Sequence, residues 1–120
     1  MLIEDFYYVK KKESLEDGGF LYEVSLNTKH KVYQGHFPEK PITPGVCNIQ
    51  MIKELAEDVL SKPLTLKAID RCRLTAMVTP DGSPTLNVKI KVEDGEKLSA
   101  EIFFNQTTYM TLSGIVCDRL

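Results

Sequence analysis

The residues best suited to chemistry in this chain lie in one short segment, Gly35-His36-Phe37-Pro38. An imidazole titrates near neutral pH, so His36 suits the role of a general base. A helical pattern begins nearby at Gly45, and the N–H groups of a helix N-terminus can stabilise a developing oxyanion. The spacing therefore predicts a histidine base facing an oxyanion site. A plainer interpretation stays open, in which His36 only bonds to backbone within a tight loop.

Gln50 follows in the same predicted helix, at a position where a carboxylate would suit acid–base chemistry with His36. Its amide can orient a hydroxyl or a water but cannot give it a proton, and losing one acid–base group typically costs ~10²–10⁴-fold in rate. Glu54 lies one turn on, at i+4 and about 6 Å away on the same face. We hypothesise that Glu54 supplies the missing carboxylate, directly or through water. The alternative is that Glu54 belongs with Lys53, Glu57 and Asp58 to a solvated helix face.

Composition narrows the class of protein. A chain of 120 residues with 42% hydrophobic and 27% charged residues predicts a single globular domain, 1–120. The formal net charge of −2 gives no basic field for nucleic acid. No apolar run approaches the roughly 20 residues needed to span a bilayer, and the acidic stretch Met1 to Asp5 lacks the apolar region of a signal peptide. We therefore expect a cytoplasmic protein.

The cysteines and histidines indicate no metal site. Cys47, Cys72 and Cys117 show no metal-ligand spacing, and His30 and His36 are the only histidines in the sequence. In a cytoplasmic protein the three thiols are expected to be reduced. The cysteines are expected to be small, buried apolar residues.

Hydrophobic periodicity predicts an α+β fold. An amphipathic helix over 45–60 carries apolar residues at helical spacing and follows a long proline-containing loop, 29–44. Turn signals separate the predicted strands, which cover 5–13, 20–28, 64–78, 85–93, 97–104 and 108–117. One helix cannot cover both faces of such a sheet. The sheet is therefore expected to wrap the helix and to bury an edge or a face against a second copy.

Two segments carry a family resemblance. Residues 33–46, Tyr-Gln-Gly-His-Phe-Pro-Glu-Lys-Pro-Ile-Thr-Pro-Gly-Val, resemble the motif of the β-hydroxyacyl-acyl carrier protein dehydratases of the FabZ/FabA type. Residues 66–81 are similar to the stretch that follows the helix in that family, although Ala76 replaces a common proline. The resemblance implies the hot-dog fold, an antiparallel sheet wrapped around one long central helix at about 44–60.

The resemblance also implies roles for individual residues. His36 would be the catalytic histidine, and the Gly45 N–H would bond to the thioester carbonyl. Gln50 falls on the family's Glu or Asp. The substrate-binding positions implied are Phe37, Pro38, Pro44 and Val46.

The reaction implied is the dehydration of a β-hydroxyacyl thioester in fatty acid or polyketide-type synthesis. The acyl chain would be carried on the phosphopantetheine arm of acyl carrier protein, without a metal or cofactor. The family works as a dimer in which the histidine of one subunit meets the acid of the other. Scattered basic residues suggest a docking surface for the carrier protein or ordinary surface charge: Lys29, Lys31, Lys40, Arg71 and Arg73.

Two other functions stay open because Gln50 replaces the acid. The chain could be a non-catalytic acyl-thioester-binding protein or the partner subunit of a heterodimer, giving His36 while the other subunit gives the carboxylate. Hot-dog proteins also include thioesterases, and Gln50 could position a water for hydrolysis. The His-Phe-Pro segment favours the dehydratase.

Overall fold

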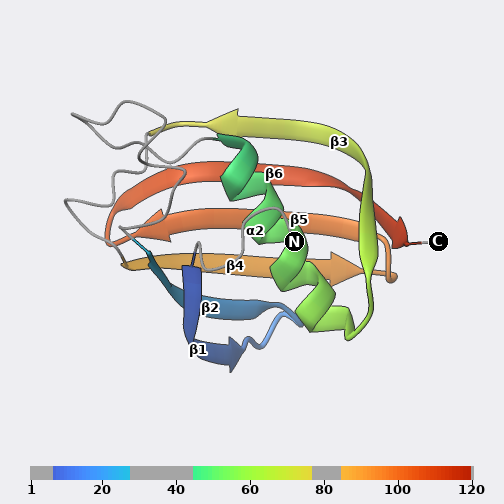
Figure 1. The fold of residues 1–120 in the computed structure, drawn as a ribbon, viewed down its shortest axis with the longest axis horizontal. Coiled ribbons are helices and arrows are strands. Elements are labelled where there is room, and N and C mark those ends of the chain that lie inside the picture. The colour runs from blue at the N-terminus through green and yellow to red at the C-terminus, as the bar shows by residue number, and fades with distance from the viewer. Residues whose placement is uncertain (1–6, 28–44, 77–84, 120) are drawn as a thin grey trace.

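The fold is an antiparallel sheet with a helix packed across one of its faces (Figure 1). The computed structural model describes residues 7–27, 45–76 and 85–119. In chain order their elements are β1 (Tyr7–Ser14), β2 (Phe20–Leu26), α2 (Gly45–Leu60), β3 (Leu64–Leu74), β4 (Thr85–Glu93), β5 (Lys97–Phe104) and β6 (Thr107–Asp118). No helix among these residues is long and apolar enough to cross a membrane.

The strand order in the sheet is β1-β2-β4-β5-β6-β3, and every neighbouring pair is antiparallel. After α2 the chain crosses to the far edge as β3, and β4 to β6 then return as a meander (Figure 1). The predicted α+β class, the helix and all six strands are confirmed. The strand predicted over 64–78 is too long, because the N–H groups of Thr75 and Ala76 both converge on the Tyr109 carbonyl and the regular ladder ends there.

Turn chemistry in the last hairpins agrees with the sequence. Gly95 has φ of 72° between β4 and β5, in the region that glycine enters without steric cost. Asn105 has φ of 54°, and Asn105-Gln106 forms a two-residue connection because Phe104 pairs with Thr107. Asparagine is one of the few other residues that adopts this conformation readily.

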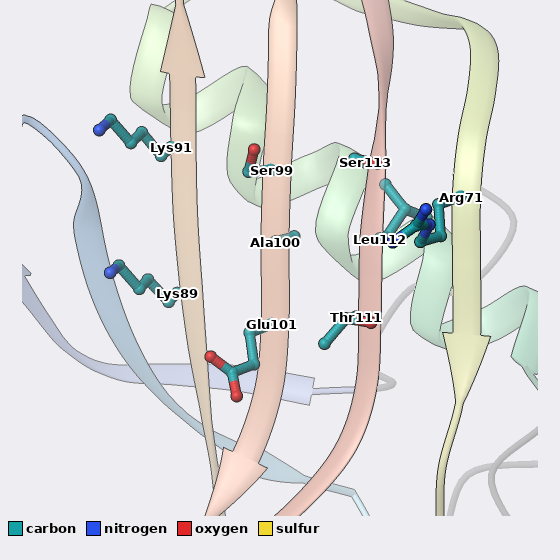
Figure 2. A pocket seen from close by; sticks show the side chains of 9 residues that line it. All are labelled: Arg71, Lys89, Lys91, Ser99, Ala100, Glu101, Thr111, Leu112 and Ser113. Carbon is teal, nitrogen blue, oxygen red and sulfur yellow. The ribbon is translucent and has the colours of Figure 1, made fainter.

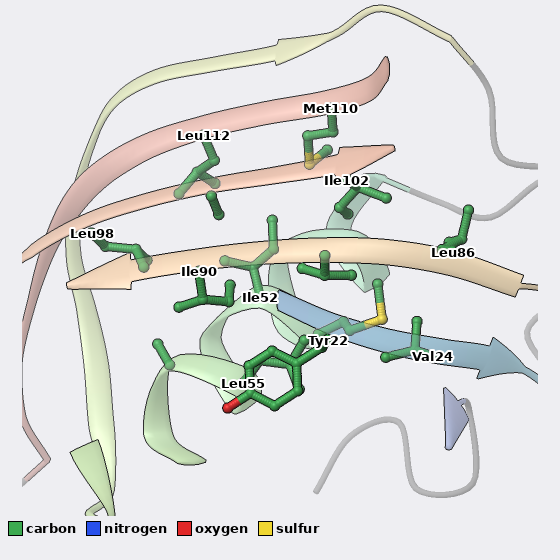
Figure 3. Packing of buried hydrophobic residues seen from close by; sticks show 14 of the residues in the cluster. Tyr22, Val24, Ile52, Leu55, Leu86, Ile90, Leu98, Ile102, Met110 and Leu112 are labelled. Atoms are coloured by element: carbon green, nitrogen blue, oxygen red, sulfur yellow. The ribbon is translucent and has the colours of Figure 1, made fainter. Parts of the chain in front are cut away.

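The core lies between α2 and the facing side of the sheet (Figure 3). The helix contributes a fully buried stripe that includes Met51, Ile52 and Leu55. Alternate strand residues such as Tyr22 and Ile102 point toward this stripe, as the period of two in a strand requires. Burying each such side chain contributes roughly 1.5–3 kcal/mol, so this layer dominates the stability of the fold.

Strand β3 is an exposed sheet edge. Beyond Leu66 its residues are exposed to the end of the strand, and Ile69 and Leu74 keep 45% and 49% of their surface accessible. Cys72 on this strand and Cys117 on β6 are free thiols and also exposed. The expectation that these two are buried is wrong, because both lie in the β3–β6 edge pair rather than under α2; the Cys47 side chain lies outside the described residues.

Gly114 allows β3 to approach β6. A Cβ built at this position would fall on the Ala68 carbonyl oxygen, well inside van der Waals contact. Ala68 and Ile69 lie between two register shifts of the β3–β6 pair, so this segment of β3 departs from the regular ladder. The missing side chain therefore lets the irregular strand lie against its neighbour.

We expect Gly114→Ala to lower the free energy of unfolding by about 1–3 kcal/mol, because the backbone of β3 must move away. Chemical denaturation of the variant measures this loss. Ser113→Ala, next along β6, is the control and should change stability little. An unchanged midpoint for Gly114→Ala would show that β3 does not approach β6 so closely in solution.

Candidate functional site

The N-terminus of α2 begins at Gly45, as the sequence predicts. The first N–H groups of a helix have no partner within it and carry the positive end of the helix dipole. The first turn contains no acidic side chain that would neutralise this end. Gly45 and Val46 therefore stand where the backbone N–H groups have no partner within the helix.

Four of the predicted site residues lie outside the described residues. They are His36, Phe37, Pro38 and Pro44. Their assignments stay predictions, and the site that the structure describes consists of the helix and the strands around it.

Gln50 and Glu54 form a hydrogen-bonded pair on one face of α2. The Nε2 of Gln50 donates to the Oε2 of Glu54 over 3.0 Å, one helical turn away. The hydroxyl of Tyr7, from β1, donates to the other carboxylate oxygen over 2.9 Å. Glu54 is half-buried, and its assignment to the site rather than to a solvated helix face stays a prediction.

The pair fixes the orientation of the Gln50 amide. The amide nitrogen of Gln50 can only donate hydrogen bonds, and it donates to Glu54. The Oε1 atom is thereby turned away from Glu54, as a hydrogen-bond acceptor. Two of the roughly four lone-pair positions of Glu54 are occupied, which leaves room for a water or a substrate hydroxyl.

Tyr7 is a site residue that the sequence patterns do not reveal. Burial, and then its hydrogen bond to Glu54, raise the pKa of Tyr7 well above its usual value. The hydroxyl therefore stays protonated and remains a donor at neutral pH. The contact joins residues 47 positions apart in the sequence, and a tyrosine beginning a strand gives no signal for it.

A second tyrosine bonds to α2 one turn further on. The Tyr22 hydroxyl, from β2, donates to Asp58 over 2.7 Å, and Lys12 lies 3.0 Å from the same carboxylate oxygen. The hydrogen bond from Tyr22, and then the one from Lys12, lower the pKa of Asp58. This contact matches the one at Glu54 in chemistry but does not involve Gln50.

Asn48 is a buried polar side chain in the first turn of α2. It is 0% exposed, and both polar atoms of its amide lack a hydrogen-bond partner among the described residues. It extends the apolar stripe of Met51 and Ile52 toward the helix N-terminus. A polar residue at the next core-facing position of that stripe was visible in the sequence and could have been noted.

The opposite face of the sheet carries a hollow of about 320 Å³. Figure 2 shows side chains such as Lys89, Lys91 and Ser99 on this face, with α2 behind the strands. Its two lysines pair with nearby carboxylates, Lys89 with Asp17 at 3.2 Å and Lys91 with Glu93 at 3.6 Å. Of the site residues that the structure describes, neither Gln50 nor Glu54 lines this hollow.

Comparison with known proteins identifies the family. The profile of the ApeI-like family, described as ApeI dehydratase, matches residues 11–114. The chain therefore belongs to this dehydratase family, and the FabZ/FabA-type resemblance of the sequence is confirmed.

Individual relatives agree with this assignment, and a solved structure shares the fold. The chain is 33% identical over 96 residues to the 3-hydroxyacyl-acyl-carrier-protein dehydratase FabZ of Syntrophobacter fumaroxidans, covering 72% of this chain but only 64% of that protein. It is 30% identical to the FabZ of Thermoanaerobacter sp. strain X514, over 69% of this chain and 73% of the relative. The fold matches a chain in the dehydratase heterocomplex ApeI:P from Xenorhabdus doucetiae with a TM-score of 0.79, 22% identity, and coverage of 92% and 96% of the two chains.

We expect Asn48→Leu to raise the free energy of unfolding by about 1–3 kcal/mol, because it replaces an unpaired buried amide by an apolar group of similar shape. Thermal and denaturant unfolding measure the change. Asn48→Asp is the matched control, and it should destabilise strongly because it buries a charge. A loss of stability in the leucine variant would mean that the amide has a hydrogen-bond partner in solution.

Proposed function

We propose that this protein is a dehydratase that acts on β-hydroxyacyl thioesters carried by acyl carrier protein. Its membership of the dehydratase family and the name of its FabZ relatives support this substrate class. The observation that carries the proposal is the half-buried carboxylate of Glu54, bonded to Gln50, in a helix that begins at Gly45. It supplies the acidic group that the position of Gln50 lacks.

Dehydration requires three functions in one site. In the proposal His36 removes the proton from the carbon next to the thioester carbonyl, and the Gly45 N–H stabilises the enolate oxygen. The bond to the β-hydroxyl then breaks, and the oxygen leaves as water once it has gained a proton. Phe37, Pro38, Pro44 and Val46 would line the substrate on the His36 side.

Gln50 and Glu54 divide the remaining function between them. The Oε1 of Gln50 accepts a hydrogen bond from the β-hydroxyl or from a water and so orients it. Glu54, one turn away, is the acid: it carries a proton when the substrate binds and gives it to the leaving hydroxyl, directly or through that water. The proposal involves no metal or cofactor beyond the carrier's phosphopantetheine arm, and it assigns the reaction to the cytoplasm.

A heterodimer is the second candidate, and a specific observation favours it. The structural relative from Xenorhabdus doucetiae is a chain of a dehydratase heterocomplex, ApeI:P. By analogy, a partner subunit could provide the carboxylate here while this chain provides His36. A thioesterase activity has no comparable support.

We expect Glu54→Gln to reduce kcat about 10²–10⁴-fold, because it removes the proton-exchanging group and keeps the size of the side chain. The assay follows hydration of a crotonyl thioester, dehydration of a β-hydroxybutyryl thioester, and thiol release. Asp58→Asn is the matched control, because it changes another carboxylate of the same helix, one that bonds to Tyr22 of β2 instead. It should leave kcat close to the wild-type value.

The outcomes separate the candidates. Full activity of Glu54→Gln would exclude Glu54 as the acid. Turnover only after a second dehydratase-like subunit is added would support the heterodimer. Thiol release without dehydration would support a thioesterase, and no reaction under any of these conditions would overturn the proposal.

We further propose that a second subunit pairs with the edge strand β3. We also propose that the sheet curves around the helix in the dimer. The two sheet edges differ in chemistry. Both edges expose two large hydrophobic residues, Tyr8 and Val9 on β1 and Ile69 and Leu74 on β3. Only β1 also has a run of lysines, Lys10 to Lys12, which protects an edge against pairing. Arg71 and Arg73 on β3 are also exposed and could contribute to docking of the carrier protein.

We expect Ile69→Glu to convert dimers into monomers, because it places a charge in the paired edge. Light scattering coupled to size-exclusion chromatography measures the mass. Val9→Glu is the matched control, because Val9 lies on the opposite edge and is 48% exposed, against 45% for Ile69. Dissociation by Val9→Glu but not by Ile69→Glu would assign the interface to β1 instead.

A further inference from the structure

We propose that Tyr7 is a positioning residue of this site, which fixes Glu54 and, through it, the amide of Gln50. The inference rests on the proposed function for its kinetic consequence, but the arrangement itself is testable without any reaction. Tyr7 lies in the first strand and none of the motifs in the sequence includes it. Its role would be to hold the two helix residues in one arrangement.

The three side chains form a continuous series of hydrogen bonds. The Tyr7 hydroxyl donates to one oxygen of Glu54 over 2.9 Å, and the other oxygen accepts from Gln50 over 3.0 Å. All three side chains are half-buried, so these bonds compete less with water than surface bonds would. A carboxylate held at both oxygens cannot rotate without breaking one of the two bonds.

A β-bulge brings Tyr7 to this position. Tyr7 and Lys12 are five residues apart and would face opposite sides of a regular strand. The register of β1 against β2 shifts between Val9 and Lys11, and this extra residue restores both side chains to the side of α2. Tyr7 then reaches Glu54 while Lys12 reaches Asp58.

The chemical consequence lies in the Gln50 amide. Its two ends differ, since the nitrogen only donates and the oxygen only accepts. While Tyr7 holds Glu54, the Gln50 nitrogen stays on the carboxylate and the oxygen is available to a substrate hydroxyl. Without Tyr7, Glu54 can turn toward water, and the amide loses the contact that sets its direction.

Tyr22 provides a matched control within the same helix. Its hydroxyl donates to Asp58, four residues beyond Glu54, with the same chemistry and a similar distance of 2.7 Å. Tyr22→Phe and Tyr7→Phe each remove one hydroxyl-to-carboxylate bond between a strand and α2. Only Tyr7→Phe removes a bond from the carboxylate that holds Gln50.

The experiment compares the full-length wild-type protein with Tyr7→Phe and Tyr22→Phe. The first readout is the NMR signal of the Gln50 side-chain amide, which should show one hydrogen-bonded proton and slow rotation in the wild type and in Tyr22→Phe. Tyr7→Phe should shift this signal toward that of a free amide. In the wild type the Tyr7 hydroxyl proton should exchange slowly with water, a measurement that stands even if the variant does not fold.

The second readout is steady-state dehydration of a β-hydroxybutyryl thioester. Tyr7→Phe should lower kcat roughly ten- to a hundred-fold, the size expected for a displaced reacting group, with KM changed by less than about twofold. Tyr22→Phe should keep the wild-type kcat even if its unfolding temperature falls.

Each result has one meaning. An unchanged Gln50 signal in Tyr7→Phe, or a Tyr7 hydroxyl in rapid exchange in the wild type, would overturn the positioning role. An active wild type with an equally active Tyr7→Phe would overturn the role while the proposed function stands. An inactive wild type with the expected NMR shifts would overturn the proposed function and leave the arrangement confirmed.

Discussion

The position of α2 on the sheet is the constraint on which the rest of the structure depends. Its buried apolar stripe provides the hydrophobic stabilisation that holds the helix on the sheet. Hydrophobic contact alone, however, permits some rotation and sliding of a helix. Three carboxylates on the polar flank limit this freedom, each toward a different strand. Glu54 accepts from Tyr7 of β1, Asp58 from Tyr22 of β2, and Glu57 from the backbone N–H of Leu64 at the start of β3.

The carboxylates on the polar flank of α2 differ in what they contact. Asp58 and Glu57 hold the helix to its neighbours, and Glu57 also bonds to Arg119 after the last strand. Glu54 makes the same kind of contact with Tyr7, but its other carboxylate oxygen also accepts a hydrogen bond from Gln50. A structural bond between a strand and a helix thus becomes part of a candidate site, because the same carboxylate also accepts from Gln50, a residue with two chemically different ends.

The elements could be predicted from the sequence, since period-two strands, one amphipathic stripe and turn residues such as Asn105 are local signals. The Gln50–Glu54 pair could also be predicted, because i,i+4 neighbours on a helix share a face. Tyr7 could not, because its place depends on a one-residue bulge in β1 that has no sequence signal. The exposed Cys72 was missed for a similar reason, since edge position is a property of strand order.

The side-chain amides of Asn48 and Gln50, on two sides of one helix, differ in burial and in hydrogen bonding. Gln50 is half-buried and its nitrogen is paired, so its oxygen is available at little cost. Asn48, two residues earlier and therefore on the other side of the helix, is fully buried with both polar atoms unpaired by described residues. Buried polar groups without partners are rare in native proteins because each costs free energy. Among the described residues, the first turn of α2 thus holds an unpaired amide beside the helix N-terminus at Gly45.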